Sequence, residues 1–483
     1  MGKSLSGGAM FVLLAAWASA SAIPGFSAAP LATPAGAFPG AQARGTSNEI
    51  FYSDFGGKIG RIASDGTVIE MDIPSPPEGG WRPSGLAFGP DGALWFLVTR
   101  TVGGAEETRM ARWEAPGPGF STYPLPSPGG GGGRVIVGPD GKIWYAQTGT
   151  SRIGRVDLSG FVTEIALTGG SSPNDLTAGP DGAVWVALEA GRIARISPDG
   201  AVADFLVPSS SSGAARPSRI IEGPDSRLFF TDPGTNAVWS ATTAGAFTRY
   251  PIPTASSEPY GLAATGGFVY FTERGPDAIG RLDPATGSIE ESALPPAGAR
   301  QFPHEITLAF PLPAPRPADT FIVNSPLLFR ADVPASSSPS GPRLRLGLLI
   351  EDEEGKPIAT APAPEAPFRV EVTVENEGES SSTLDLVVSL ALPKDGEVVE
   401  AGSCSLSGES TLLCPFRSPI PAGARGSFSV VLRFRAGARA GAPISALIFG
   451  GGDPTTPRAA IAVFGRALRV GASAPPAILG GRH

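Results

Sequence analysis

The sequence predicts an all-β protein in which a seven-bladed β-propeller, with six blades as the alternative, precedes a β-sandwich. The main observation is a repeat in which a Gly-Pro-Asp-Gly turn leads into an aromatic strand. Clear copies start at Gly89, Gly138 and Gly179, and worn copies start at Gly45, Gly223 and Ala264. Consecutive starts lie 41 to 49 residues apart, a period typical of propeller blades. The 65 Gly and 51 Pro residues supply the turns that such a fold requires.

The unit from Asp175 to Val207 shows how one repeat would form a blade. Pro-Asp-Gly and Ala-Gly turns separate four short segments, 175–179, 183–188, 192–196 and 202–207. The third segment alternates apolar and basic residues with period two, which is typical of a half-buried strand. Four antiparallel strands make a blade, and a blade that is apolar on both faces must stack against neighbours around an axis.

The N-terminal residues 1–22 have the pattern of a secretory signal peptide. Lys3 provides the positive end, Ala9–Trp17 is a short apolar core, and Ala20 and Ala22 are small residues suited to cleavage. An uncleaved anchor is the alternative. No other stretch is apolar over the roughly 18 residues that a membrane-spanning helix requires, so no span is expected in the mature chain.

Residues 23–44 are rich in Ala, Pro and Gly and are not periodic, which predicts a linker. The alternative for part of this segment is pairing with the last blade, which would close the ring. The propeller itself is predicted over residues 45–334. Its seventh unit rests on Pro317–Val323 and Leu327–Asp332, which align in outline with the strands of the clear repeats.

Residues 335–342 form a Ser/Pro-rich linker to a second domain, predicted over residues 343–466. Its apolar or alternating segments predict strands at 343–351, 368–375, 384–392, 427–434 and 459–464. Short strands separated by turns indicate a β-sandwich. Cys404 and Cys414 are expected to pair as a disulfide in an oxidising compartment, with two free thiols as the alternative. Residues 467–483 are expected to be a disordered tail.

Several repeat motifs resemble those of the virginiamycin B lyase family. The chain carries Trp144 with Ile153-Gly-Arg155, Lys58-Ile-Gly-Arg-Ile, Ile279-Gly-Arg-Leu, Arg249-Tyr-Pro-Ile-Pro and Glu258-Pro-Tyr-Gly-Leu. The resemblance covers roughly residues 45–310. It implies a seven-bladed propeller and a Mg²⁺-dependent elimination that opens the ring of type B streptogramins without hydrolysis.

The second domain resembles the Ig-like conserved-repeat domain of bacterial surface proteins. The resemblance rests on Val372-Thr-Val-Glu-Asn-Glu-Gly, Leu392-Pro, the Cys404 and Cys414 pair, and Pro421-Ala-Gly. It implies an Ig-like β-sandwich over residues 343–466.

A Pro-x-x-[Ile/Leu] pattern marks the residues expected just before each innermost strand, at the mouth of the axial channel. These residues are Ser84, Asn174, Ser218, Tyr260 and His304, with Gly133 in the blade that lacks the Pro. Glu258 lies two residues before Tyr260 and is expected at the same mouth. Convergent polar groups at such a mouth form the default ligand site.

His304, in Pro303-His-Glu-Ile, matches one histidine of the lyase site, which implies a role as general acid or base. The remaining family positions depart from the pattern. Tyr260 replaces the second histidine, Phe302 replaces a glutamate, and Asp319–Val323 contains no Glu. Glu258 and Glu273 are nearby carboxylates that would have to substitute, and the alternative for each is a solvated surface charge.

The first hypothesis is therefore an extracytoplasmic, periplasmic or secreted, binding or scaffold protein. Its partner would be a small molecule, a peptide or a protein at the propeller mouth. The net charge of −8 argues against nucleic acid. The alternative is a Mg²⁺-dependent lyase acting on a cyclic depsipeptide, with His304 as acid or base. A sugar-lactone hydrolase with axial calcium near Asn174 and Asp175 is a weaker third hypothesis, and no metal site is predicted for a binding protein.

Two further sets of repeated residues have structural interpretations. The Pro-Asp-Gly aspartates are expected to form turns. The arginines that alternate with apolar residues are expected to face solvent or a carboxylate of the next blade. These arginines are Arg61, Arg155, Arg195, Arg281 and Arg330.

Overall fold

The computed structural model describes residues 21–468, apart from 35, 46–48, 64, 75–79, 116, 118, 169–170, 212, 297–301, 310–317, 325–327, 335–343, 353–355, 358–364, 377–380, 383–385, 393–395, 408–410, 417, 436–443, 450–457 and 464–465. The predicted signal peptide up to residue 20, the linker at 335–342 and the tail beyond 468 lie outside the described residues. The described chain is all-β, and its helical elements are short 3₁₀ turns such as η1 (Thr148–Thr150) and η3 (Pro224–Ser226).

Three antiparallel four-stranded sheets come first along the chain. The first holds β2 (Pro39–Arg44), β3 (Ile50–Asp54), β4 (Lys58–Ile62) and β5 (Val68–Asp72). The second holds β6 (Arg82–Phe88), β7 (Leu94–Val102), β8 (Ala105–Trp113) and β9 (Phe120–Pro124). The third holds β10 (Val135–Val137), β11 (Ile143–Gln147), β12 (Arg152–Val156) and β13 (Val162–Ala166).

Four further four-stranded sheets follow in the same pattern. The fourth holds β14 (Pro173–Ala178), β15 (Val184–Leu188), β16 (Arg192–Ile196) and β17 (Val202–Leu206). The fifth holds β18 (Ile220–Glu222), β19 (Leu228–Asp232), β20 (Ala237–Ala241) and β21 (Phe247–Pro251). The sixth holds β22 (Pro259–Thr265), β23 (Phe268–Glu273), β24 (Ala278–Leu282) and β25 (Ile289–Ala293). The seventh holds β26 (Ile306–Ala309), β27 (Ala318–Asn324), β28 (Leu328–Pro334) and β1 (Ser27–Pro30).

The first strands of these sheets lie next to one another around a common axis. β2 contacts β6, and the contacts continue through β10, β14, β18, β22 and β26. β26 in turn contacts β2, so the succession returns to its starting point. Because each sheet is apolar on both faces, this arrangement lets every sheet bury its faces against two neighbours, as a β-propeller requires.

The segment 23–44, predicted as a linker, is instead part of the sheets. β1 pairs antiparallel with β28, from Ser27 opposite Asp332 to Pro30 opposite Phe329, and β2 pairs with β3. Ile23 is buried and its N–H donates to Ser292 Oγ at 3.0 Å. Composition was misleading here because β1 and β2 form backbone pairs with β28 and β3 although their own residues show no apolar periodicity. The pairing with the last sheet was the alternative that the sequence left open.

A fixed cross-strand pair shapes the middle of several sheets. Tyr52 lies opposite Gly60, Tyr145 opposite Gly154, and Phe271 opposite Gly280. A Cβ at any of these glycines would lie within about 2 Å of the aromatic ring, so the glycine makes room for the ring. The pair differs in other sheets: Val186 lies opposite Ala194 in the fourth, and Phe230 lies opposite Trp239 in the fifth.

The Pro-Asp-Gly aspartates form the turns, as predicted, and also hold the following strand. Asp140 Oδ1 accepts from the backbone N–H of Lys142 at 3.2 Å and from the indole of Trp144 at 2.7 Å. Asp181 repeats these contacts with Trp185 and also accepts from Arg195 Nε at 2.5 Å. Arg195 was expected to face solvent or a carboxylate of the next blade, and its side chain is 31% exposed. Its partner is the turn of its own sheet, because β14 and β16 flank β15 and bring the turn aspartate beside it.

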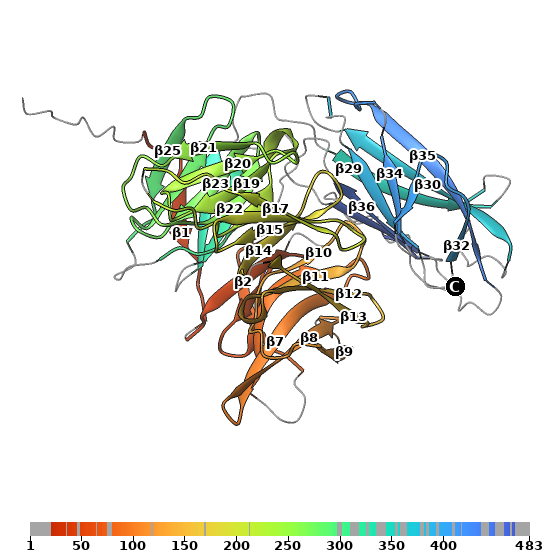
Figure 1. Cartoon of the computed structure of the whole chain (residues 1–483), viewed down its shortest axis with the longest axis horizontal. Coiled ribbons are helices and arrows are strands. Elements are labelled where there is room, and N and C mark those ends of the chain that lie inside the picture. Colours follow the sequence, from red (N-terminus) through yellow and green to blue (C-terminus); the bar gives the residue numbers. More distant parts are fainter. Residues whose placement is uncertain are drawn as a thin grey trace, which may run out of the picture.

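A second body contains two antiparallel sheets that share one apolar core. One holds β29 (Leu344–Glu351), β30 (Pro367–Asn376), β35 (Arg425–Phe434) and β32 (Gly396–Glu400). The other holds β33 (Ser405–Ser407), β34 (Thr411–Pro415), β31 (Val387–Ala391), β36 (Ile444–Phe449), β37 (Arg458–Val463) and β38 (Arg466–Leu468). Val370 and Val372 of the first sheet pack with Val388 and Ile448 of the second. In Figure 1 the teal-to-blue strands of the second body gather beside the red-to-green strands of the propeller.

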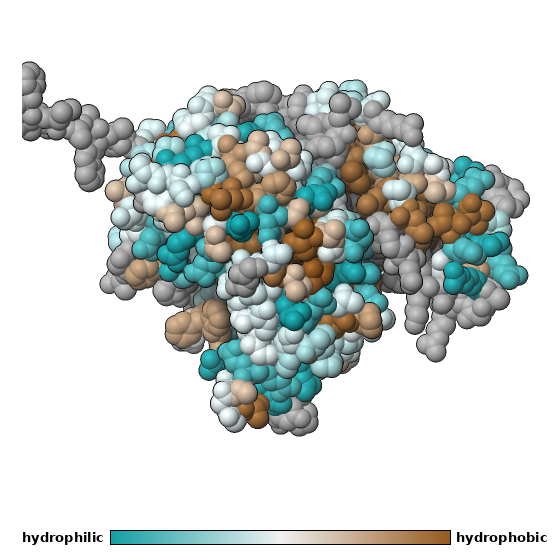
Figure 2. Space-filling model, in the orientation of Figure 1, coloured by the Kyte–Doolittle hydropathy of each residue, from teal (hydrophilic) through white to brown (hydrophobic). Residues whose placement is uncertain are grey.

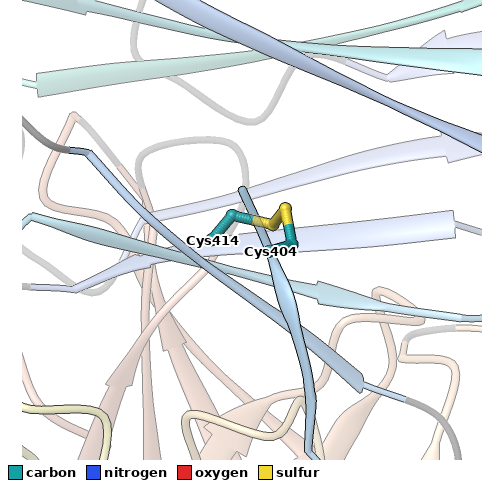
Figure 3. The surroundings of a disulfide bond; sticks show 2 residues. All are labelled: Cys404 and Cys414. Atoms are coloured by element: carbon teal, nitrogen blue, oxygen red, sulfur yellow. A yellow bond between two sulfur atoms is a disulfide. The ribbon is translucent and has the colours of Figure 1, made fainter. Parts of the chain in front are cut away.

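The predicted disulfide between Cys404 and Cys414 is confirmed, and it fastens the segment before β33 to β34 (Figure 3). Apolar residues on the face shown in Figure 2 form separate patches on both bodies, with hydrophilic residues between them. Within the described ranges, no helix has the length and apolar character needed to cross a bilayer.

Candidate functional site

The start of the innermost strand carries an irregularity that recurs from sheet to sheet. The strand register shifts between Ser84 and Leu86, between Pro173 and Asp175, and between Pro259 and Leu262. A bulge of this kind places an extra residue in the strand and redirects its side chains. Both middle residues of the Pro-x-x-[Ile/Leu] pattern can therefore be presented near the propeller axis, where strict alternation would present only one.

The structure brings some of the predicted mouth residues together. The rings of Tyr260 and His304 meet edge to face with their centroids 5.5 Å apart, and both residues are half-buried. Asn174 is also half-buried, and its Nδ2 donates to the carbonyl of Pro217 at 2.8 Å. Ser218 is buried, and its N–H donates to the carbonyl of Thr231. These four residues are held by neighbouring sheets around one side of the axis.

The remaining predicted positions contribute less. Ser84 lies against Gly132, where a Cβ would come within 1.9 Å of its hydroxyl oxygen, so this part of the mouth is closely packed. Glu258 is exposed and has a positive φ of 50°. Its carbonyl accepts from the N–H of Arg274 at 3.3 Å. Among the described residues, no hydrogen bond joins Glu258 to His304.

A group of four charged residues lies one position further along the same pattern, and we call it the axial cluster: Arg134, Asp175, Arg219 and Glu305. Arg219 Nη2 lies 2.6 Å from Glu305 Oε1, and Arg134 Nη1 lies 3.4 Å from Glu305 Oε2. Arg134 Nε also lies 3.6 Å from Asp175 Oδ1. The third, fourth, fifth and seventh sheets thus each contribute one charge.

Asp175 was expected near the axis from the sequence, and the other three members were not. The signal was present, because each directly follows a predicted mouth residue or its equivalent, as Glu305 follows His304. These three residues directly precede β10, β18 and β26, so the alternation of side chains within a strand gives no guide to where they point.

Burial and pairing act in opposite directions in the axial cluster. Burial raises the pKa of Asp175 above its usual range, even though Arg134 and Arg219 act to lower it. Burial would also raise the pKa of Glu305, but Arg219 and Arg134 together hold it below its usual range. Glu305 is therefore the carboxylate whose charge the two arginines sustain.

Tyr260 contacts His304 and two arginines, one of which, Arg219, belongs to the axial cluster. The guanidinium carbon of Arg219 is 4.3 Å from the centroid of the Tyr260 ring, and that of Arg274 is 5.1 Å away. The pKa of His304 is lowered, first by burial and then by Arg274, with Arg219 adding to the effect and Glu305 opposing it. The imidazole is therefore neutral near pH 7 and capable of accepting a proton.

Two buried threonines fix the backbone that carries these rings. Thr231 Oγ1 accepts from the N–H of Arg219 at 3.1 Å and donates to the carbonyl of Tyr260 at 2.7 Å. Thr272 Oγ1 repeats the arrangement one sheet later, accepting from Gly261 at 2.8 Å and donating to His304 at 3.0 Å. Each hydroxyl thus ties the innermost strand of its own sheet to that of the next.

The residues present do not fit a Mg²⁺ site of the kind that the resemblance implies. Magnesium takes oxygen ligands, usually one or two carboxylates and several waters. Asp175 and Glu305 are the axial carboxylates of the described chain, and arginines already lie against both. A divalent cation there would be repelled by two guanidiniums, and no group of three or more His, Cys, Asp or Glu side chains gathers elsewhere in the described ranges.

Comparisons with known proteins agree with the fold. The sequence model of the Virginiamycin B lyase family matches residues 82–310. A virginiamycin B lyase from Nocardia farcinica is 29% identical over 234 residues, which are 47% of this chain and 74% of that protein.

Two solved structures of lyases match the propeller at 26% identity. A streptogramin B lyase has a TM-score of 0.55, covering 63% of this chain and 97% of that one. A catalytically inactive virginiamycin B lyase from Staphylococcus aureus with Quinupristin also has a TM-score of 0.55, covering 64% and 99%. The N-terminal body of this chain is therefore a β-propeller similar to that of the virginiamycin B lyases.

Proposed function

We propose that this protein is an extracytoplasmic binding or scaffold protein. Its seven sheets would be the seven blades of a propeller that holds a ligand at its mouth without transforming it. One observation carries the proposal: the axial cluster pairs its two carboxylates with two arginines. The resemblance implies a histidine and glutamates around His304, and among the described residues the side chain found against it is Tyr260, whose ring packs edge to face.

An exported location is supported by the disulfide, because such bonds persist in oxidising compartments. The N-terminal residues have the signal-peptide pattern, and we expect the mature chain to begin near Ser21 or Ile23. The two C-terminal sheets would be an Ig-like domain that acts as a spacer or as a second contact surface.

The second candidate function is a lyase that opens a cyclic depsipeptide. Its support is the half-buried His304, whose lowered pKa keeps the imidazole neutral and able to act as a general base. The similar proteins described above are virginiamycin B or streptogramin B lyases, but Tyr260 and Phe302 stand where the resemblance requires a histidine and a glutamate.

Mass spectrometry of a type B streptogramin, incubated with the full chain and Mg²⁺, separates the two functions. We expect the ring to remain intact at every incubation time. Linear product that disappears in the His304→Ala variant would overturn the binding proposal. A Glu106→Gln variant, altered at an exposed residue of the β7–β8 hairpin, is the matched control for protein quality.

A further inference from the structure

We propose that the propeller mouth binds a ligand carrying an anionic oxygen group, a carboxylate or a phosphate, joined to an apolar body. The inference deepens the proposed function, because it assigns a chemical class to the ligand of the same mouth. It starts from a stack of three side chains, in which Arg219 and Arg274 lie over the ring of Tyr260 at 4.3 and 5.1 Å.

A stacked guanidinium keeps its hydrogen-bonding capacity. It has five N–H donors in a planar fork, and contact with a ring face uses none of them. Arg219 directs Nε and Nη2 to Glu305. Arg274 directly follows β23 of the sixth sheet and is half-buried. Planar forks of this type recognise carboxylate and phosphate oxygens, often with two parallel hydrogen bonds.

The electrostatic environment points in the same direction. Burial is the first cause of the lowered pKa of His304; among the charges that act on it, Arg274 and Arg219 lower the pKa and Glu305 raises it. Two other acidic groups lie nearby. Glu258 is exposed to solvent, and Asp277 accepts from the N–H of Phe302 at 2.8 Å. Solvent screens an exposed charge such as Glu258, so it opposes an incoming anion only weakly.

Exposed phenylalanines supply the apolar side of the mouth. Phe302 directly precedes Pro303 of the pattern, and Phe38 directly precedes Pro39, the first residue of β2. The innermost strands of these two sheets, β26 and β2, contact each other. Phe38 is 60% exposed and Phe55, whose N–H donates to the carbonyl of Phe38, is 56% exposed, while Phe302 is 37% exposed. Large exposed aromatic side chains beside a polar mouth are typical of ligand contact surfaces.

Titration of the full chain with three matched probes tests the inference. The probes are 3-phenylpropanoate, phenyl phosphate and the neutral 3-phenylpropanamide, followed by ligand-observed NMR. We expect at least one anion to bind about tenfold or more tightly than the amide, and to weaken as salt is added. The anion that binds more tightly shows whether the mouth prefers a carboxylate or a phosphate group.

The Arg274→Gln variant should lose about tenfold in affinity for the better anion and leave amide binding unchanged. Arg192→Gln, altered at a half-buried arginine of the fourth sheet, is the matched control and should bind like the unaltered protein. Equal binding of acid and amide would refute the anionic ligand but keep a binding mouth. Absence of binding by all three probes, or unaltered anion affinity in Arg274→Gln, would also refute it. Streptogramin turnover would instead refute the proposed function.

Discussion

At the scale of single residues, Glu305 holds the centre of the propeller together. It is buried, and it is the carboxylate that both Arg219 and Arg134 contact. Removing one partner of a buried ionic group leaves the remaining charges uncompensated, which costs about 3–5 kcal/mol. We therefore expect Glu305→Gln to lower the free energy of unfolding by about that amount, measured by urea denaturation.

The control for this substitution is Asp225→Asn. Asp225 pairs with Arg227 at 3.3 Å, but its side chain is 74% exposed. An exposed pair contributes about 0–1 kcal/mol, so this variant should unfold like the unaltered protein. Equal effects of the two substitutions would show that the axial cluster does not stabilise the propeller.

Glu273 gives the propeller a distinct pH dependence. Burial, and then the charge of Glu291, raise its pKa to about 9. The folded state therefore keeps a proton that the unfolded chain releases above its usual, much lower pKa. Stability from this group is present at low pH and is lost as pH rises towards about 9, with a slope of at most about 1.4 kcal/mol per pH unit.

We expect the Glu273→Gln variant to flatten this slope, because a neutral amide of the same shape has no proton to release. Urea unfolding between about pH 5 and 9 measures it. Glu106→Gln, at an exposed glutamate, should retain the slope of the unaltered protein. A slope that persists in Glu273→Gln would assign the pH dependence to another group.

At this scale, the position of the mouth could be predicted from the sequence, but the charged residues beside it could not. The Pro-x-x-[Ile/Leu] pattern found Tyr260 and His304, which do meet. It missed Arg219 and Glu305, because these residues directly precede β18 and β26, where strand alternation gives no guide to side-chain direction. It also missed Arg274, which comes from the turn after β23 and lies 14 residues from Tyr260 in the sequence.

At the scale of the sheet, the aromatic and glycine pair decides which residues a repeat can tolerate. A Cβ on Gly154 would lie 1.8 Å from the ring of Tyr145, so Gly154→Ala must displace the ring. Overpacking of this kind costs about 1–3 kcal/mol. We expect Gly154→Ala to lower the thermal midpoint. The Tyr145→Val, Gly154→Ala double variant, which copies Val186 and Ala194, should lose less than the sum of the single losses.

A double-mutant cycle measured by calorimetry checks this coupling. Additive losses would mean that the ring and the glycine do not share one space. The same cycle at Val186 and Ala194, with Val186→Tyr and Ala194→Gly, is the reciprocal control and should show coupling of the same sign.

The strands themselves were predictable where side chains alternate or turns recur. The four strands predicted from Asp175 to Val207 lie within about one or two residues of β14 to β17. In the second body, β32, β33, β34, β36 and β38 were missed, and β38 includes the first two residues of the predicted tail. β33 spans only Ser405–Ser407, too short to show a period, and its place is set by pairing with β34.

At the scale of the whole molecule, the two bodies have separate cores. The core of the second body contains residues from Leu344 to Ile448, including the disulfide residue Cys414. Closing a short loop with a disulfide contributes about 3 kcal/mol in the chain-entropy model. The Cys404→Ala, Cys414→Ala variant should therefore lower the unfolding midpoint of this body alone. Calorimetry of the full chain would contradict this if the propeller transition shifted by the same amount.

As a whole, the propeller is a ring of sheets with paired charges along its axis, and we propose that its mouth receives an anion. A crystal structure of the full chain grown with both 3-phenylpropanoate and Mg²⁺ tests this most directly. We predict a carboxylate within hydrogen-bond distance of Arg274 or Arg219, with the contacts among Arg134, Asp175, Arg219 and Glu305 preserved. A magnesium ion coordinated by Asp175 or Glu305, with the arginines displaced, would contradict it.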